Sequence, residues 1–376
     1  MATINYLTTI EFDFGAVSKA ADIAKSAGMK RPLLVTDPGL AKGPVMARVR
    51  EVLAPLDPAV FDATPQNPDE ESVEKAVAIY KQHGCDGVVA LGGGSPIDLA
   101  KAVALLATHD GPLEQYAMIL GGLPKITNRI APVIAIPTTA GTGSEVGRAA
   151  LITLRDGRKL GFISPFMIPR VALCDPELTL ALPAKLTAAT GMDALTHCIE
   201  TFLSPRVNPP ADAIALDGAM RAANWIRPAF FEPDNRDARW NMMMASLQGG
   251  LTFQKGLGAV HSMSHPLGGL KQVLLHHGTL NAVILPAVLR YNRSHAGEKI
   301  EALERALVVR PGEDLAGFVE RLNVDLGLPP SLRAMGVTEE MIPAMVEGAM
   351  KDHSTATNPR PLAREDFETL FRQALQ

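Results

Sequence analysis

The sequence predicts an α/β amino-terminal domain with a parallel sheet, residues 1–178, followed by an all-helical carboxyl-terminal domain, residues 179–376. Three observations support this prediction. A chain of 376 residues exceeds the usual size of one hydrophobic core. Short β-rich apolar runs alternate with amphipathic stretches as far as about residue 178, the pattern of a parallel sheet with crossover helices. Beyond that point the β-rich runs cease and long helical segments take over.

Five strands are expected in the first domain, each bounded by Pro, Gly or Asp. They are Pro32–Thr36, Val60–Ala63, Gly87–Ala90, Val133–Ile136 and Val171–Cys174. A helix is predicted over Asp69–Gln82, because Asn67 can cap it, Pro68 suits the first helical position and three acidic residues follow. The helices of the second domain are expected to break at residues 204–210, 232–236, 269–275, 311–313 and 328–330, where Pro, Gly and polar residues gather.

Composition narrows the classes of function. Hydrophobic residues make up 47% of the chain and charged residues 20%, which is typical of an ordinary globular protein. A net charge of −4 without a Lys/Arg run argues against nucleic acid as a partner and against a membrane surface. The start of the chain has no secretory pattern, so a cytoplasmic protein is expected. Three sparse cysteines, Cys85, Cys174 and Cys198, are expected to be buried thiols without a disulfide.

Three clusters of potential metal ligands stand out in the second domain. Asp193 and His197 are spaced i, i+4 in GMDALTHCIE, and His261 and His265 are spaced i, i+4 in AVHSMSHPLGG. On helices, each pair would project from one face at neighbouring turns. A third cluster, His276 and His277, follows in LLHHGTLN. Five of the nine histidines lie in these apolar segments, where a bound cation would offset the cost of burying polar groups.

The candidate ligand set is Asp193, His197, His261 and one of His276 or His277. One carboxylate and three imidazoles suit Fe²⁺ or Zn²⁺ and do not suit Mg²⁺ or Ca²⁺, which prefer oxygen ligands. The alternative interpretation is a set of hydrogen-bonded core histidines, which is the commoner explanation of a single HxxxH. Three clusters together favour the metal site.

Two glycine-rich segments predict a phosphate-binding cradle in the first domain. In VVALGGGSPIDLAK an apolar strand leads into Gly92–Ser95, and Pro96 opens a helix whose N–H groups can face a pyrophosphate. The segment PTTAGTGS, residues 137–144, follows another apolar strand and offers hydroxyls and glycines for a ribose or nicotinamide. Neither matches G-x-G-x-x-G, so the usual Rossmann fingerprint is not present in these loops.

The order of GGGSPIDLAK, PTTAGTGSE, GMDALTHCIE, HSMSHPLGG and HHGTLNAVILP resembles the iron-dependent (group III) alcohol dehydrogenases over nearly the whole chain. Within that family the segments LTAATGMDALTHCIETFLSPRVNPPAD and QKGLGAVHSMSHPLGGLK are most similar to bacterial 4-hydroxybutyrate dehydrogenases. The resemblance implies a dehydroquinate synthase-like fold. It also implies a metal-dependent oxidoreductase that transfers a hydride between NAD and a short primary alcohol or aldehyde, with 4-hydroxybutyrate and succinic semialdehyde as the expected pair.

The resemblance also implies roles for individual residues. Asp193, His197, His261 and His277 match the metal ligands, with His277 favoured over His276 because the family's ligand directly precedes a glycine, here Gly278. His265 matches an active-site histidine near the nicotinamide, either a proton relay or a support for a ligand. The positions that match cofactor contacts are Asp37, Gly93, Gly94, Ser95, Thr138, Thr139, Ser144 and Lys159.

The chain departs from the family pattern in two places. The stretch between His265 and His277 is longer than in many members, and Gln254 followed by Lys255 replaces an asparagine that is common upstream of His261. A substrate carboxylate would need a cation, and Arg148 and Lys255 lie in motifs near the expected site. Salt bridges at the surface or between domains are the alternative roles for these two cations.

The expected cofactors are NAD and Fe²⁺, with Zn²⁺ as the alternative ion, and a homodimer is expected. Two other functions fit parts of the sequence: a general short-chain alcohol or diol dehydrogenase, and a non-catalytic subunit that binds NAD or metal. The second predicts loss of a ligand or of His265, and all of them are present.

Overall fold

The computed structural model describes residues 8–270 and 272–376 of the chain. Its described residues divide into two compact units. The α/β unit comprises residues 8–139 and 143–180, and the helical unit comprises residues 140–142 and 181–376. The expected class, a parallel α/β domain followed by a helical domain, is confirmed.

Six parallel strands form the sheet of the α/β unit, in the order β1-β8-β5-β4-β2-β3. They are β1 (Thr9–Phe12), β2 (Pro32–Val35), β3 (Ala59–Phe61), β4 (Gly87–Gly92), β5 (Val133–Pro137) and β8 (Val171–Cys174). The five strands expected from the sequence are all present, with ends that differ by at most two residues, and Val171–Cys174 matches β8 at both ends. The sequence reasoning missed β1, which is a short strand paired at the edge of the sheet with β8.

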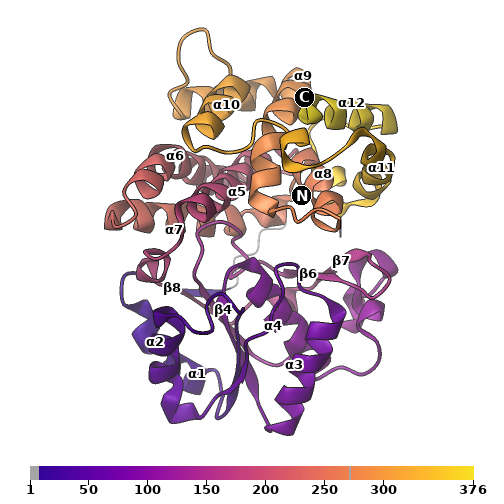
Figure 1. The fold of residues 1–376 in the computed structure, drawn as a ribbon. Helices are drawn as coiled ribbons and strands as arrows, with labels where there is room; N and C mark the ends of the chain where they lie inside the picture. The colour runs from indigo at the N-terminus through magenta and orange to yellow at the C-terminus, as the bar shows by residue number, and fades with distance from the viewer. Residues whose placement is uncertain (1–7, 271) are drawn as a thin grey trace. The chain divides into compact units, whose positions relative to one another are not determined.

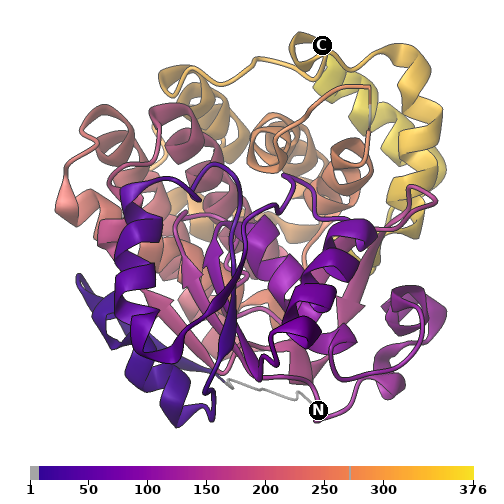
Figure 2. The same ribbon diagram turned by 60° about the horizontal axis from the view of Figure 1, so that its bottom comes forward.

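Helices cover both faces of this sheet (Figures 1 and 2). On one face α1 (Ala20–Ser26) and α2 (Pro44–Leu53) pack with Leu34 of β2. On the other face α3 (Glu70–Gln82) and α4 (Gly94–Leu106) pack with Leu33 and Val35. Successive side chains of β2 therefore point into opposite cores, which explains why its sequence, PLLV, is apolar throughout.

The amino-terminal end of α3 differs in detail from the prediction. Its N-cap is Asp69, whose side chain accepts a hydrogen bond from Ser72 N at 2.8 Å. Asn67, the expected cap, instead accepts from Lys159 Nζ at 3.1 Å. The cap therefore falls two residues later than Asn67, at the acidic residue whose carboxylate reaches the first turn.

A second element that the sequence reasoning missed is the antiparallel hairpin of β6 (Ala149–Thr153) and β7 (Lys159–Ile163). Lys101 of α4 is fully buried and holds the chain leading into it: its Nζ donates to the carbonyl oxygens of Ser144, Gly147 and Ala149. Asp98, also on α4, accepts from Leu151 N of β6. The hairpin is thus fixed by charged groups on a neighbouring helix, which local sequence patterns do not reveal.

The helical unit contains no strand among its described residues, as expected. Its helices are α5 (Ala184–Leu203), α6 (Pro209–Phe231), α7 (Arg236–Leu251), α8 (Ala259–Gly268), α9 (His277–Ala306), α10 (Leu315–Asp325), α11 (Ile342–Lys351) and α12 (Arg364–Leu375). The five expected breaks all coincide with gaps between these helices, and 204–210 and 232–236 extend by up to two residues into the helix that follows. Seventeen of the 20 residues of α5 are buried, so this helix is the core of the unit and any polar group it carries is removed from water.

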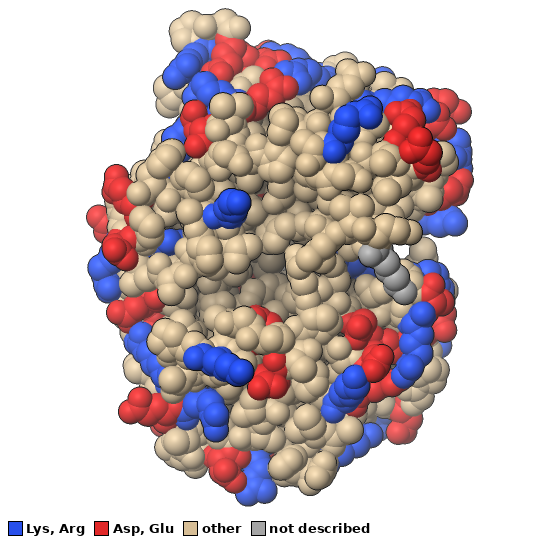
Figure 3. Space-filling view, in the orientation of Figure 1, with Lys and Arg blue, Asp and Glu red and all other residues tan. Residues whose placement is uncertain are grey.

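Two further expectations concern charge and cysteine. On the face drawn in Figure 3, positive and negative side chains are interspersed without a broad area of one sign. Cys85, Cys174 and Cys198 are buried free thiols. Among the described helices, none combines the length and apolar character needed to cross a membrane.

Candidate active site

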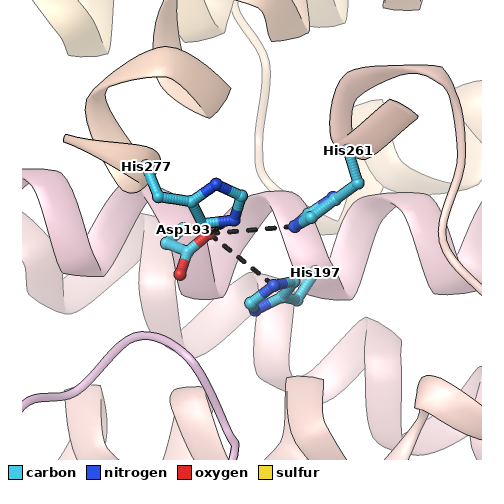
Figure 4. Close-up of side chains that lie close together, drawn as sticks. All are labelled: Asp193, His197, His261 and His277. Carbon is cyan, nitrogen blue, oxygen red and sulfur yellow. Dashed lines mark ion pairs between the residues drawn. The ribbon is translucent and has the colours of Figure 1, made fainter. Parts of the chain in front are cut away.

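Four side chains of the helical unit bring their ligand atoms within 4.8 Å of one another: Asp193, His197, His261 and His277. Asp193 and His197 lie one turn apart on α5, His261 lies on α8 and His277 is the first residue of α9. The three imidazoles point toward Asp193 (Figure 4). Asp193 Oδ1 lies 3.6 Å from His197 Nε2, 3.9 Å from His261 Nε2 and 3.7 Å from His277 Nε2. One carboxylate and three imidazoles at this spacing fit a first-row divalent ion.

Neighbouring groups fix two of these imidazoles through their other ring nitrogen. His261 Nδ1 lies 2.5 Å from Glu200 Oε2, and His197 Nδ1 lies 3.2 Å from Gly141 O. Both acceptors favour a proton on Nδ1, which leaves the Nε2 lone pair directed at Asp193. Gly141 belongs to the short segment 140–142 that joins the helical unit, and a Cβ atom at this position would lie 2.7 Å from Thr190 Cβ.

Burial keeps one of the four side chains, His261, in the neutral form that binds a metal ion. It lowers the pKa of His261 well below its usual range, and the nearby His197 acts in the same direction. Burial also raises the pKa of Glu200 to about 7, against hydrogen bonds from the backbone N–H groups of Val260 and Gly258. A neutral imidazole is the form that binds metal, so the low pKa of His261 favours a ligand role.

The two adjacent histidines at the start of α9 occupy different surroundings. His277 joins the four-residue cluster. His276 is the N-cap residue of α9, and its Nδ1 is buried without a hydrogen-bond partner in the described part of the chain. Of the two histidines, His277 is therefore the one that lies in the four-residue cluster.

His265 lies beside the cluster and outside it. Its Nδ1 is 2.8 Å from Asp352 Oδ2, and its ring stacks on His277 with centroids 5.5 Å apart. It also stacks on His353 at 6.0 Å. Although burial alone would raise the pKa of Asp352, the charge and hydrogen bond of His265 lower it. The pair is therefore an imidazole held in place by a carboxylate, which suits either a proton relay or a support for His277.

Several expected cofactor residues meet at one point of the sheet. The chain leaves β2 toward β3 on one side and returns to β4 on the other, so the carboxyl ends of β2 and β4 form a switch point, where α/β sheets bind ligands. Asp37 follows β2, and a Cβ atom on Gly92, at the end of β4, would lie 3.3 Å from Asp37 Oδ2. Gly92 has φ +147°, a conformation that favours glycine. The N-cap of α4 is Gly93, which has no side chain to bond the N–H groups of the first turn. These N–H groups can therefore face an anion.

The remaining cofactor candidates line the same edge of the sheet or its loops. A Cβ atom on Gly93 would approach Thr139 Oγ1 to 3.2 Å, and Thr138 N donates to Gly92 O at 3.0 Å. Gly94 is the first residue of α4. Ser95 Oγ donates to the backbone oxygen of Gln66. The next residue, Asn67, accepts from Lys159 through its side chain. Ser144 is buried, and its hydroxyl donates to Asp98 at 2.6 Å, so it supports the loop.

The two expected substrate cations differ. Arg148 is exposed on the α/β unit. Lys255 is fully buried in the helical unit, where its ammonium forms an ion pair with Asp212. The structure thus gives Lys255 a protein carboxylate as its partner in place of the expected substrate carboxylate. A buried cation needs such a partner. Lys255 and Asp212 are 43 residues apart, so the sequence alone does not reveal the pair.

Sequence reasoning also missed three polar residues around the four ligands. Glu200 and Asp352 hold His261 and His265. Asn281 donates to Asp193 Oδ1 at 2.7 Å. Asn281 follows His277 by four residues, so the i, i+4 rule could have identified it, but Glu200 and Asp352 meet their histidines only through the packing of distant helices.

Comparison with known proteins agrees with this architecture. The family model described as "Iron-containing alcohol dehydrogenase" matches residues 8–176, and "Fe-containing alcohol dehydrogenase family, C-terminal" matches residues 187–375. The chain therefore belongs to the iron-containing alcohol dehydrogenases, a family of oxidoreductases.

Particular relatives narrow the comparison. The chain is 54% identical to a 4-hydroxybutyrate dehydrogenase of Cupriavidus necator, with all of both chains covered. Among solved structures, a 1,3-propanediol oxidoreductase has a TM-score of 0.91 and 36% identity, covering 99% of this chain and 100% of the other. A sulfoacetaldehyde reductase from Bifidobacterium kashiwanohense, solved in complex with NAD⁺, has a TM-score of 0.90 and 30% identity, covering 100% and 98%.

Proposed function

We propose that this protein catalyses the reversible oxidation of 4-hydroxybutyrate to succinic semialdehyde with NAD, and that Asp193, His197, His261 and His277 hold a divalent ion, Fe²⁺ first and Zn²⁺ as the alternative. The observation that carries the proposal is the convergence of these four side chains. The chain that contains them is 54% identical over its full length to a 4-hydroxybutyrate dehydrogenase.

The reaction removes a hydride from the carbon that bears the hydroxyl and a proton from its oxygen. A bound divalent ion would supply Lewis-acid polarisation of that oxygen, and NAD would accept the hydride. The chain's own contribution is to hold ligand side chains in place before the ion arrives. Glu200 does this through its hydrogen bond with His261, and the backbone oxygen of Gly141 does it through its hydrogen bond with His197. Because burial lowers the pKa of His261, this imidazole needs no deprotonation at the moment of binding.

NAD is proposed to bind at the switch point formed by the ends of β2 and β4. Asp37 lies there, and a carboxylate in this place accepts from ribose hydroxyls and repels a 2′-phosphate. The helix start of α4, with Gly93 and Gly94, offers backbone N–H groups for the pyrophosphate. The relative solved with NAD⁺ supports the choice of dinucleotide. Ser95, Thr138, Thr139 and Lys159 remain proposed cofactor contacts, and Ser144 is proposed to act by shaping the loop.

His265 is proposed to move the alcohol proton toward solvent, or to hold His277 in place. The Asp352 carboxylate favours a proton on His265 Nδ1, which leaves Nε2 to accept one. Arg148 is the remaining proposed anchor for the substrate carboxylate, since Lys255 is paired with Asp212. We also propose that the protein is cytoplasmic and forms a homodimer. Light scattering of the purified protein would test the homodimer.

A general alcohol or diol dehydrogenase is the second candidate, favoured by the likeness to the 1,3-propanediol oxidoreductase. The test is a panel of 4-hydroxybutyrate, 1,3-propanediol, lactaldehyde and simple alcohols, each with NAD and with NADP, followed by NADH or NADPH absorbance. We expect 4-hydroxybutyrate with NAD to give the highest kcat/KM. A higher value for 1,3-propanediol would favour the second candidate, and no turnover with any alcohol would favour a non-catalytic subunit.

A further inference from the structure

The amide of Asn281 contacts three of the four proposed metal ligands. Asn281 is fully buried on α9, one turn after His277. Its Nδ2 lies 2.7 Å from Asp193 Oδ1, 3.1 Å from His277 Nε2 and 3.2 Å from His261 Nε2. Its Oδ1 is also buried and has no hydrogen-bond partner within residues 8–270 and 272–376. The donor end of the amide therefore faces the ligand atoms themselves.

These contacts change in a defined way when an ion binds. A neutral imidazole has one ring-nitrogen lone pair for an acceptor role, and the ion would take it on His261 and on His277. A carboxylate oxygen has further lone pairs, so Asp193 Oδ1 can still accept from Asn281 Nδ2. A buried carboxylate without a donor is unfavourable. Asn281 is thus suited to both states: without the ion its two N–H groups are shared among three acceptors, and with the ion one of them can still donate to Asp193.

We infer that Asn281 is a positioning residue for the metal centre, an inference that rests on the proposed four-ligand site. Its amide keeps Asp193, His261 and His277 together before the ion binds and orients the Asp193 carboxylate afterwards. Loss of an outer partner of a metal ligand commonly costs about 10- to 100-fold in metal affinity. Asn281 should contribute within that range.

The test is a titration with Co²⁺ of protein from which metal has been removed by a chelator. Competition with a coloured chelator measures the affinity for Co²⁺, and the visible absorption of Co²⁺ reports its coordination. We expect Asn281→Ala and Asn281→Leu to bind Co²⁺ about 10- to 100-fold more weakly than the unmutated protein, with a changed spectrum. Leu fills most of the space of Asn, so it separates the lost donor from a cavity. The matched control is Asn323→Ala: Asn323 is also buried and donates to Ala282 O at 2.7 Å, and it contacts none of the four ligands in the bonds described for it.

A third variant keeps the test decisive if the first two fold poorly. Asn281→Asp has the same shape but replaces the donor with a second carboxylate beside Asp193. It should lower the thermal midpoint of the ion-free protein more than that of the Co²⁺-loaded protein, because the ion compensates the added charge. Wild-type affinity and spectrum in Asn281→Leu, or equal midpoint losses with and without Co²⁺ in Asn281→Asp, would overturn the inference alone. Failure of the unmutated chain to take up Co²⁺ would overturn the metal site and the inference together.

Discussion

His276 and His277 differ by one position in the sequence, yet only His277 belongs to the four-residue cluster described here. His276 is the N-cap with an extended backbone and His277 is the first helical residue, so the two adjacent side chains point in different directions. His277→Ala should therefore remove most of the bound metal and most of the turnover, while His276→Ala should keep the metal. Elemental analysis of the two purified variants measures this directly. Full metal occupancy in His277→Ala with loss in His276→Ala would reverse the ligand assignment.

Asp37 provides a second prediction at the scale of one residue. Its Oδ1 already accepts from Gly39 N and Leu40 N, so the carboxylate is held at the end of β2. A fixed negative charge there should favour NAD over NADP, because the extra phosphate would be repelled. Asp37→Gly should narrow the ratio of kcat/KM between the two cofactors. Equal kcat/KM with NAD and NADP in the unmutated protein would contradict the role.

Glu145 provides a prediction about pH and stability. This residue is buried in the α/β unit, and burial raises its pKa to about 7, despite its own backbone N–H and the Lys101 ammonium. The folded state then holds a proton that the unfolded state has released between about pH 4.5 and 7, so the contribution of Glu145 to stability falls as the pH rises through that window. Glu145→Gln stays neutral, and its thermal midpoint relative to the unmutated protein should rise from pH 5 to about pH 8. A midpoint difference independent of pH would contradict the raised pKa.

At the scale of elements, the segment 140–142 of the glycine-rich loop packs against α5. A Cβ atom on Gly141 would lie 2.7 to 3.0 Å from Thr190 Cβ, O and Cα, and two of these atoms are backbone. Gly141→Ala must therefore displace the carbonyl that accepts from His197. We expect a loss of more than about 10-fold in metal affinity, by analogy with other outer partners of metal ligands.

The control for that variant is Gly297→Ala on α9, where a Cβ atom would meet nothing within 4 Å. Alanine there should leave metal affinity unchanged, because the added methyl group meets no neighbouring atom. Chelator competition and thermal unfolding of both variants make the measurement. Unchanged metal affinity in Gly141→Ala would show that the loop does not position His197.

The elements also show where sequence reasoning succeeds and fails. The strands β2, β4, β5 and β8 are buried apolar runs with clear boundaries, so their own residues identify them. The hairpin β6–β7 depends instead on Asp98 and Lys101 of α4, which lie 53 and 48 residues from their partners Leu151 and Ala149. The same distinction applies to the site. The i, i+4 spacing singles out Asp193 and His197. Glu200, in contrast, lies 61 residues from its partner His261 in the sequence, and the two meet only because their helices pack together.

At the scale of the whole molecule, the central claim is that a metal-dependent dehydrogenase of this family acts on a short ω-hydroxy acid with NAD. Proteins of the same fold are named for different substrates, among them 1,3-propanediol and sulfoacetaldehyde. The residues of the pocket, and not the fold, therefore determine the substrate. A carboxylate on the substrate, paired with a protein cation such as Arg148, should separate 4-hydroxybutyrate from an uncharged alcohol of similar length. Arg148 is exposed in the described structure, so an ion pair with it contributes up to about 1 kcal/mol, and more only where bound substrate excludes water from it.

The most direct measurement is kcat/KM for 4-hydroxybutyrate and for 1-butanol, with NAD, on the Fe²⁺-loaded protein, repeated after chelation and with Arg148→Ala. We predict a preference of roughly 5-fold or more for 4-hydroxybutyrate, activity that disappears with the metal, and a reduced preference in Arg148→Ala. A preference that survives Arg148→Ala would mean that other residues bind the carboxylate. A value for 1-butanol equal to or above that for 4-hydroxybutyrate, or full turnover in metal-free protein, would contradict the central claim.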